Sequence, residues 1–151
     1  MFKYMLYFIA ATALYVRGAL VREGVHLVHC SESWDDGKTH GPWRYSAMNY
    51  YADDSKAHAG AGGGFPDRAT FDPKPAAGKP VTFQDQVVKG KFKSGVVFTS
   101  YIKKGVDKLP AFSYAGWGTN GYRNFECWRD DEHLIFWLTP LENCYSIYYC
   151  L

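Results

Sequence analysis

Arg123, Glu126 and His133 come closest to a catalytic set in this chain of 151 residues. An arginine can bind a phosphate, a carboxylate can act as general base and a histidine as general acid, the groups that cleavage of RNA requires. Glu126 and His133 can approach each other only across a hairpin. Arg123 and Glu126 differ by an odd number of positions, so on one strand they face opposite ways. The sequence therefore favours a protein without a catalytic site, and these three residues are the candidates if it is an enzyme.

Aromatic residues are the second feature that could carry function. The chain has 12 Tyr, 10 Phe and 5 Trp, together 18% of its residues, more than one small core can bury. Trp117, Tyr122 and Trp128 are the residues that we expect at a binding surface. We place Trp117 at a loop tip, because glycines and an Asn-Gly turn surround it. Exposed Tyr and Trp are typical of surfaces that recognise proteins or sugars.

Two disulfides are predicted by the four cysteines, Cys30, Cys127, Cys144 and Cys150. Their spacing is not that of a zinc site, and we expect neither a metal nor a cofactor. If residues 129–132 and 139–143 turn two hairpins, Cys127 and Cys144 lie too far apart to be joined. Cys144 and Cys150 are too far apart along one strand for the same reason. Elimination then pairs Cys30 with Cys144 and Cys127 with Cys150, although a different strand order could defeat this pairing.

The N-terminal segment 1–18 reads as a secretory signal peptide. It has a cationic start and an apolar run too short to span a bilayer, and small residues allow cleavage after Gly18. Of the 17 basic residues in the chain, Lys3 and Arg17 lie in this segment, so the mature chain has as many basic as its 15 acidic residues. A neutral chain is a poor candidate for binding nucleic acid, and no second apolar stretch predicts a membrane span.

The elements expected to position these residues make one α+β domain over residues 19–151. A strand at 25–30 is followed by a helix that begins near Pro42 and ends at Gly60, because Trp43, Ala47 and Tyr50 fall at helical intervals. Glycines and prolines make residues 59–80 a long surface loop. From Val81 onward short strands alternate with turns, which predicts an antiparallel sheet on which the helix packs.

The layout of the chain resembles that of small secreted effectors of plant-associated fungi. Residues 27–30 (LVHC) begin the mature protein with a strand that bears a cysteine, and residues 148–150 (YYC) end it with another. One group of these effectors is similar to fungal guanyl-preferring ribonucleases that have lost activity. There the terminal cysteines join, which implies Cys30 with Cys150 and so contradicts the pairing by elimination. Residues 67–69 (DRA) are similar to an element of that group but lie far from the C-terminus, so no catalytic residue is carried over.

Three functional hypotheses follow, in this order. The first is a secreted, monomeric interaction protein, a virulence effector that binds a host protein or glycan outside or inside the host cell. The second is a secreted ribonuclease or ribotoxin-like hydrolase that uses Arg123, Glu126 and His133. The third is a carbohydrate-binding module that uses aromatic platforms.

Overall fold

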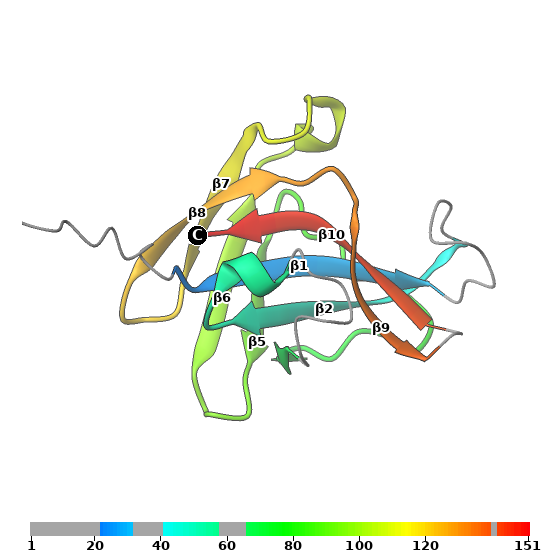
Figure 1. Cartoon of the computed structure of the whole chain (residues 1–151), viewed down its shortest axis with the longest axis horizontal. Helices are drawn as coiled ribbons and strands as arrows, with labels where there is room; N and C mark the ends of the chain where they lie inside the picture. Colours follow the sequence, from blue (N-terminus) through cyan, green and yellow to red (C-terminus); the bar gives the residue numbers. More distant parts are fainter. Residues whose placement is uncertain (1–21, 32–40, 58–65, 140–141) are drawn as a thin grey trace, which may run out of the picture.

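The computed structural model describes residues 22–31, 41–57, 66–139 and 142–151, which form one antiparallel sheet that nearly closes into a barrel (Figure 1). The predicted signal peptide, residues 1–18, lies outside the described residues, as do residues 59–65 of the predicted loop. The strands are β1 (Gly24–Ser31), β2 (Trp43–Tyr51), β3 (Asp67–Arg68), β4 (Thr70–Phe71), β5 (Val87–Lys91), β6 (Val97–Ile102), β7 (Tyr114–Thr119), β8 (Asn124–Arg129), β9 (Leu134–Thr139) and β10 (Glu142–Cys150).

The strand order explains how the sheet nearly closes. Its path runs β3-β2-β1-β10-β8-β7-β6-β5-β4, and β9 pairs with β10 beside this path. The two ends of the path, β3 and β4, are separated along the chain by Ala69 alone, whose N–H donates to the carbonyl of Met48 at 3.0 Å. One short segment therefore continues the sheet from β2 to β5. The predicted loop 59–80 is a loop only in part, since it contains both of these strands.

The helix predicted from Pro42 onward does not form in the described residues 42–57, and the α+β prediction is wrong because the fold is nearly all β. Most of that stretch is β2, which pairs with β1 along its length. Residues 46–49 are buried on both faces of the sheet, so the polar alternation that marks a half-exposed strand is missing. The aromatic residues of β2 favour strands, and pairing with β1 outweighs the helical spacing. No helix of the described residues is long and apolar enough to cross a membrane.

The C-terminal third is the predicted succession of strands with two differences. Residues 129–132 do not turn a hairpin, because β9 pairs with the first half of β10 and β8 pairs with its last three residues. Strands β8 and β9 thus follow one another along the same edge of β10. Trp117 lies within β7 and not at a loop tip, and the chain turns after Thr119.

Both disulfides join residues directly opposite each other on neighbouring strands. Cys30 of β1 bonds to Cys144 and Cys127 of β8 bonds to Cys150, with Cα–Cα distances of 4.1 and 4.0 Å. The pairing reached by elimination is confirmed, and the pairing that the resemblance implied, Cys30 with Cys150, is wrong. The predicted hairpin at 129–132 was not needed for this result. Cys127 lies opposite Cys150 at one end of β10, whereas Cys144 belongs to β10 itself and lies near its other end, so the two are far apart.

The core has two layers. The barrel interior is filled by fully buried residues such as Leu27, Phe98 and Ile102. A second cluster covers the outer face of β1, β2 and β10, where Ile135 of β9 packs with Val28. In Figure 1, β9 and the turn that follows β2 lie across this face. The outer face of β6, β7 and β8 is different, because large aromatic side chains remain exposed there.

Candidate functional site

The predicted catalytic residues Arg123, Glu126 and His133 do not form a site. The backbone of Glu126 is hydrogen-bonded to that of Leu151, and the carbonyl of His133 accepts a hydrogen bond from the N–H of Ser146. Ser146 and Leu151 are five positions apart on an extended segment, which separates Glu126 from His133 by about 17 Å. A general acid and a general base must both reach one substrate within hydrogen-bond distance. The spacing of Glu126 and His133 does not allow this.

A constellation that the sequence analysis did not find surrounds His26 in β1. Its Nε2 lies 3.0 Å from Oδ1 of Asp54, and its Nδ1 lies 2.7 Å from Oγ of Ser146. A carboxylate, a histidine and a serine in this order are the groups of many hydrolases. His26 and Ser146 are both 0% exposed, so a substrate cannot reach the hydroxyl. We assign these contacts a structural role, because they satisfy polar atoms that are buried on β1 and β10.

Asp130, Asp131 and His133 form a second polar cluster, in the loop between β8 and β9. Their potential ligand atoms lie within 4.8 Å of one another. Nδ1 of His133 is 2.7 Å from Oδ1 of Asp131 and 3.1 Å from Oδ1 of Asp130, so this nitrogen is engaged by the carboxylates themselves. The cluster therefore reads as an ion pair, and no second observation points to a metal.

Burial and hydrogen bonding act on the two ends of this ion pair. The hydrogen bond to Asp130 raises the pKa of His133, against the smaller lowering effect of burial. Burial raises the pKa of Asp130, but hydrogen bonds from His133 and Ser146 outweigh it and lower the pKa to about 2. At neutral pH Asp130 is thus a buried anion, and its hydrogen bond with His133 favours the protonated form of that histidine.

The strongest candidate for a contact surface is the outer face of β6, β7 and β8. We call it the aromatic face and define it by Tyr101, Tyr114, Trp117, Glu126 and Trp128. Tyr101 and Trp117 lie opposite each other on neighbouring strands, with ring centroids 6.3 Å apart and planes inclined by 28°. The rings of Tyr114 and Trp128 meet edge to face at 5.6 Å. Trp117 is 44% exposed and Tyr114 40%, although both belong to a central strand.

A β-bulge in β7 places both of these rings on one face. Tyr114 and Trp117 are three positions apart, which on a regular strand would turn them to opposite faces. The register between β7 and β8 shifts between Tyr114 and Gly116, so one extra residue is accommodated there. Gly116 is required at this point, because a Cβ atom would lie 2.0 Å from the carbonyl oxygen of Tyr101. The bulge and its glycine are therefore what bring the two aromatic rings together.

A shallow hollow of about 350 Å³ lies beside these rings. Among the residues that line it are Tyr114, Trp117, Asn124 and Glu126. The ammonium of Lys103 lies 4.4 Å from the centre of the Tyr114 ring, on the same part of the surface. Aromatic faces, a carboxylate and an amide can together bind the apolar faces and the hydroxyl groups of a polar ligand.

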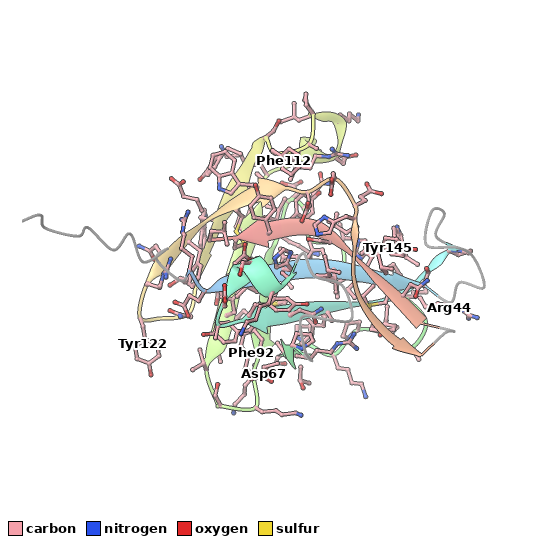
Figure 2. All side chains as sticks on the ribbon, viewed as in Figure 1. Arg44, Asp67, Phe92, Phe112, Tyr122 and Tyr145 are labelled. Carbon is pink, nitrogen blue, oxygen red and sulfur yellow. A yellow bond between two sulfur atoms is a disulfide. The ribbon has the colours of Figure 1, made fainter. Side chains whose placement is uncertain are left out.

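No family model, curated protein sequence or solved structure matches this chain. Its function is therefore inferred from its own residues. Of the three residues predicted to bind, Trp117 and Trp128 share the aromatic face, whereas Tyr122 protrudes from the turn before β8 and is 87% exposed (Figure 2). Tyr101, Tyr114 and Asn124 were missed. Their exposure depends on which side of the sheet is covered, and the sequence did not reveal the bulge that turns Tyr114 outward.

Proposed function

We propose that this protein is secreted and acts as a binding protein, an effector that contacts a macromolecule of a host through its aromatic face. The observation that carries the proposal is the exposure of Trp117 and Tyr114 on a rigid, central part of the sheet. Large apolar rings that are exposed on a monomer contribute no hydrophobic free energy until a partner covers them. A rigid sheet also holds the rings in place, so little entropy is lost on binding.

Secretion is supported by two independent features. All four cysteines form disulfides, which persist in oxidising compartments. The apolar segment at residues 1–18 has the length of a signal peptide. The resemblance in layout to secreted fungal effectors points to the same compartment. The proposal of a host partner rests on this resemblance, and the proposal of a contact surface rests on the geometry.

The shape of the surface favours a glycan over a protein as partner. Tyr101 and Trp117 are stacked with planes inclined by 28°, and the exposed Trp117 offers its ring as a platform. The C–H faces of sugar rings can stack on such a platform, and Asn124 and Glu126 border the hollow with groups that hydrogen-bond hydroxyls. A protein partner would instead be anchored by a side chain in a deep, desolvated pocket. The hollow here is shallow.

An array of plant and fungal cell-wall oligosaccharides, incubated with the mature protein, tests the proposal. We expect selective binding to one class of glycan by the native protein and by Tyr122→Ala, which removes an exposed ring outside the hollow. We expect Trp117→Ala to abolish that signal while the protein keeps its melting temperature.

Two results would overturn the proposal. Equal signals from native protein and Trp117→Ala would show that the aromatic face is not the contact surface. Cleavage of RNA that disappears in His133→Ala would replace binding by catalysis. If no glycan binds, but a purified host protein binds in a manner that depends on Trp117, the surface is right and the class of partner is wrong.

A further inference from the structure

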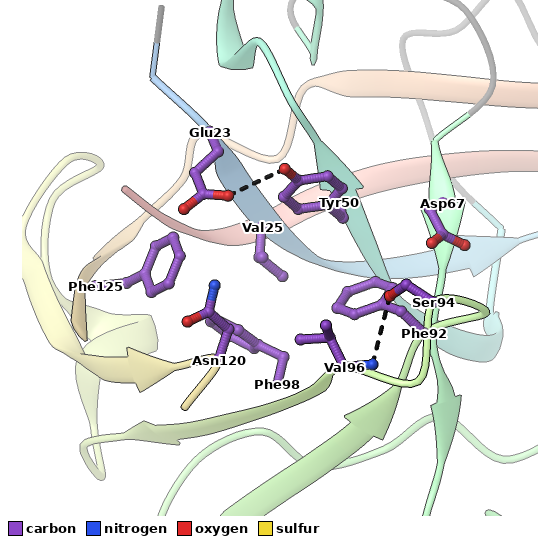
Figure 3. Close-up of a pocket in the computed structure, with 10 residues that line it drawn as sticks. All are labelled: Glu23, Val25, Tyr50, Asp67, Phe92, Ser94, Val96, Phe98, Asn120 and Phe125. Atoms are coloured by element: carbon purple, nitrogen blue, oxygen red, sulfur yellow. Dashed lines mark hydrogen bonds between the residues drawn. The ribbon is translucent and has the colours of Figure 1, made fainter. Parts of the chain in front are cut away.

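One end of the barrel encloses a cavity that is separate from the aromatic face. It has a volume of about 270 Å³ and lies between the start of β1, the end of β2, the turn between β5 and β6 and the turn between β7 and β8 (Figure 3). Its inner wall consists of apolar side chains from four parts of the sheet, namely Val25, Phe92, Val96, Phe98 and Phe125. Val25, Phe98 and Phe125 are each no more than 2% exposed, so this wall belongs to the barrel interior.

Two carboxylates border the opening, and they differ in their pairing. Glu23 accepts a hydrogen bond from the hydroxyl of Tyr50 at 3.0 Å and forms an ion pair with Arg123 at 3.1 Å. Asp67, in β3, forms no hydrogen bond or ion pair through its side chain with any of the described residues. Figure 3 shows Asp67 beside Phe92, on the opposite side of the cavity from Glu23 and Phe125. The charge of Glu23 is therefore compensated by Arg123, whereas none of the described residues compensates that of Asp67.

We propose that this cavity binds a small organic cation with an apolar body, with its charged group at Asp67. A carboxylate attracts a protonated amine more strongly beside an apolar wall than in open water, because less solvent screens the charges. The phenylalanine rings add to this preference, since the face of an aromatic ring attracts cations. The apolar part of the ligand then fills the space between Phe92, Phe98 and Phe125. Glu23 and its partner Arg123 form a neutral part of the opening.

The volume limits the size of the ligand. A cavity of about 150 Å³ in a protein core holds one benzene molecule. The present cavity of about 270 Å³ has room for one or two fused rings with a short amine chain. It is too small for an oligosaccharide or a peptide, so it does not serve the glycan proposed for the aromatic face.

Titration calorimetry with four probes tests this inference on the mature protein. The probes are tryptamine, 2-phenylethylamine, the neutral 2-phenylethanol and the anionic 3-phenylpropanoate. We expect the amines to bind at least tenfold more tightly than the alcohol, and the acid not to bind. Asp67→Asn keeps the shape of the side chain but removes its charge, and should lower amine affinity about tenfold without changing that for the alcohol.

Two further variants separate this site from general effects. Asp85→Asn removes an exposed carboxylate elsewhere, whose partner is Lys104 at 3.8 Å, and should bind the amines like the native protein. Val96→Phe fills the cavity and should abolish binding of all probes while leaving any glycan binding unchanged. Equal affinity for amine and alcohol, or no loss in Asp67→Asn, would contradict the assignment of the cation. Failure of every probe to bind the native protein would contradict the cavity as a site.

Discussion

At His133 the chain places a titratable group against a buried anion. Asp130 is 1% exposed, and the hydrogen bond from His133 helps to keep it ionised. The sequence named His133 for a different reason, as a general acid facing Glu126, and the absence of the hairpin removes that partner. Similarly, Asp54 is distant from His26 in sequence, and their contact depends on the turn after β2. Residue types could be predicted here, but their partners could not, because tertiary packing decides them.

The pKa of His133 makes stability depend on pH. A histidine whose pKa is raised by folding stabilises the native state below its unfolded pKa of about 6.5, and this contribution disappears as pH rises through the folded pKa. We expect the free energy of unfolding to fall by about 1 kcal/mol over that interval. In His133→Gln this fall should be absent. Urea unfolding between pH 5.5 and 8.5 measures it, and equal slopes for native protein and variant would refute the ion pair.

Among the elements, β7 depends most on a single residue. The sequence predicted most strands from β6 onward, because their apolar runs are bounded by turn residues. It failed at β2, where burial on both faces hides the period of two, and at 129–132, where charged residues look like a turn. The bulge at Gly116 was also beyond the sequence, since the need for glycine arises from the close approach of Tyr101.

Gly116→Ala tests that explanation of β7. The added methyl group would lie 2.0 Å from a backbone oxygen, so the strands must move apart. We expect a loss of more than 2 kcal/mol in the free energy of unfolding, together with loss of partner binding. Gly95→Ala is the control, because its Cβ meets nothing within 4 Å and costs only about 1 kcal/mol of backbone strain. Similar losses in the two variants, measured by chemical denaturation, would argue against a special role for the bulge.

For the whole molecule, near-closure of the sheet and the two disulfides together fix the position of the aromatic face. That residues 67–71 would connect β2 to β5 could not be predicted, because such short strands lack any periodic pattern. The disulfide pairing was predicted correctly, although one of the two hairpins on which the prediction rested, at 129–132, does not form. The aromatic excess correctly pointed to exposed rings, while their location required the fold.

The two disulfides should contribute unequally to stability. Cys30–Cys144 closes a separation of 114 residues and Cys127–Cys150 one of 23. In the chain-entropy model these correspond to about 5 and about 3 kcal/mol, respectively. We therefore expect the double variant Cys30→Ser/Cys144→Ser to lower the melting temperature more than Cys127→Ser/Cys150→Ser. Differential scanning calorimetry decides this, and the reverse order would show that strain or residual structure dominates.

Processing at the N-terminus is a further test at this scale. If residues 1–18 are a signal peptide, protein recovered from culture medium should begin near Ala19. Because two disulfides form, its mass should be lower than that of the reduced mature chain by four hydrogen atoms. Edman sequencing and intact-mass spectrometry measure both. Recovery of Met1 or of free thiols in secreted protein would reject the proposed compartment.

Calorimetric titration of the best glycan from the array into native protein and Trp117→Ala tests the central claim most directly. Trp117 is the most exposed ring of the hollow, and truncation of a central aromatic contact typically costs 2 kcal/mol or more. We predict affinity at least about thirtyfold weaker for Trp117→Ala, with an unchanged melting temperature and with native affinity in Tyr122→Ala. Native affinity in Trp117→Ala would contradict the assignment of the aromatic face as the binding surface.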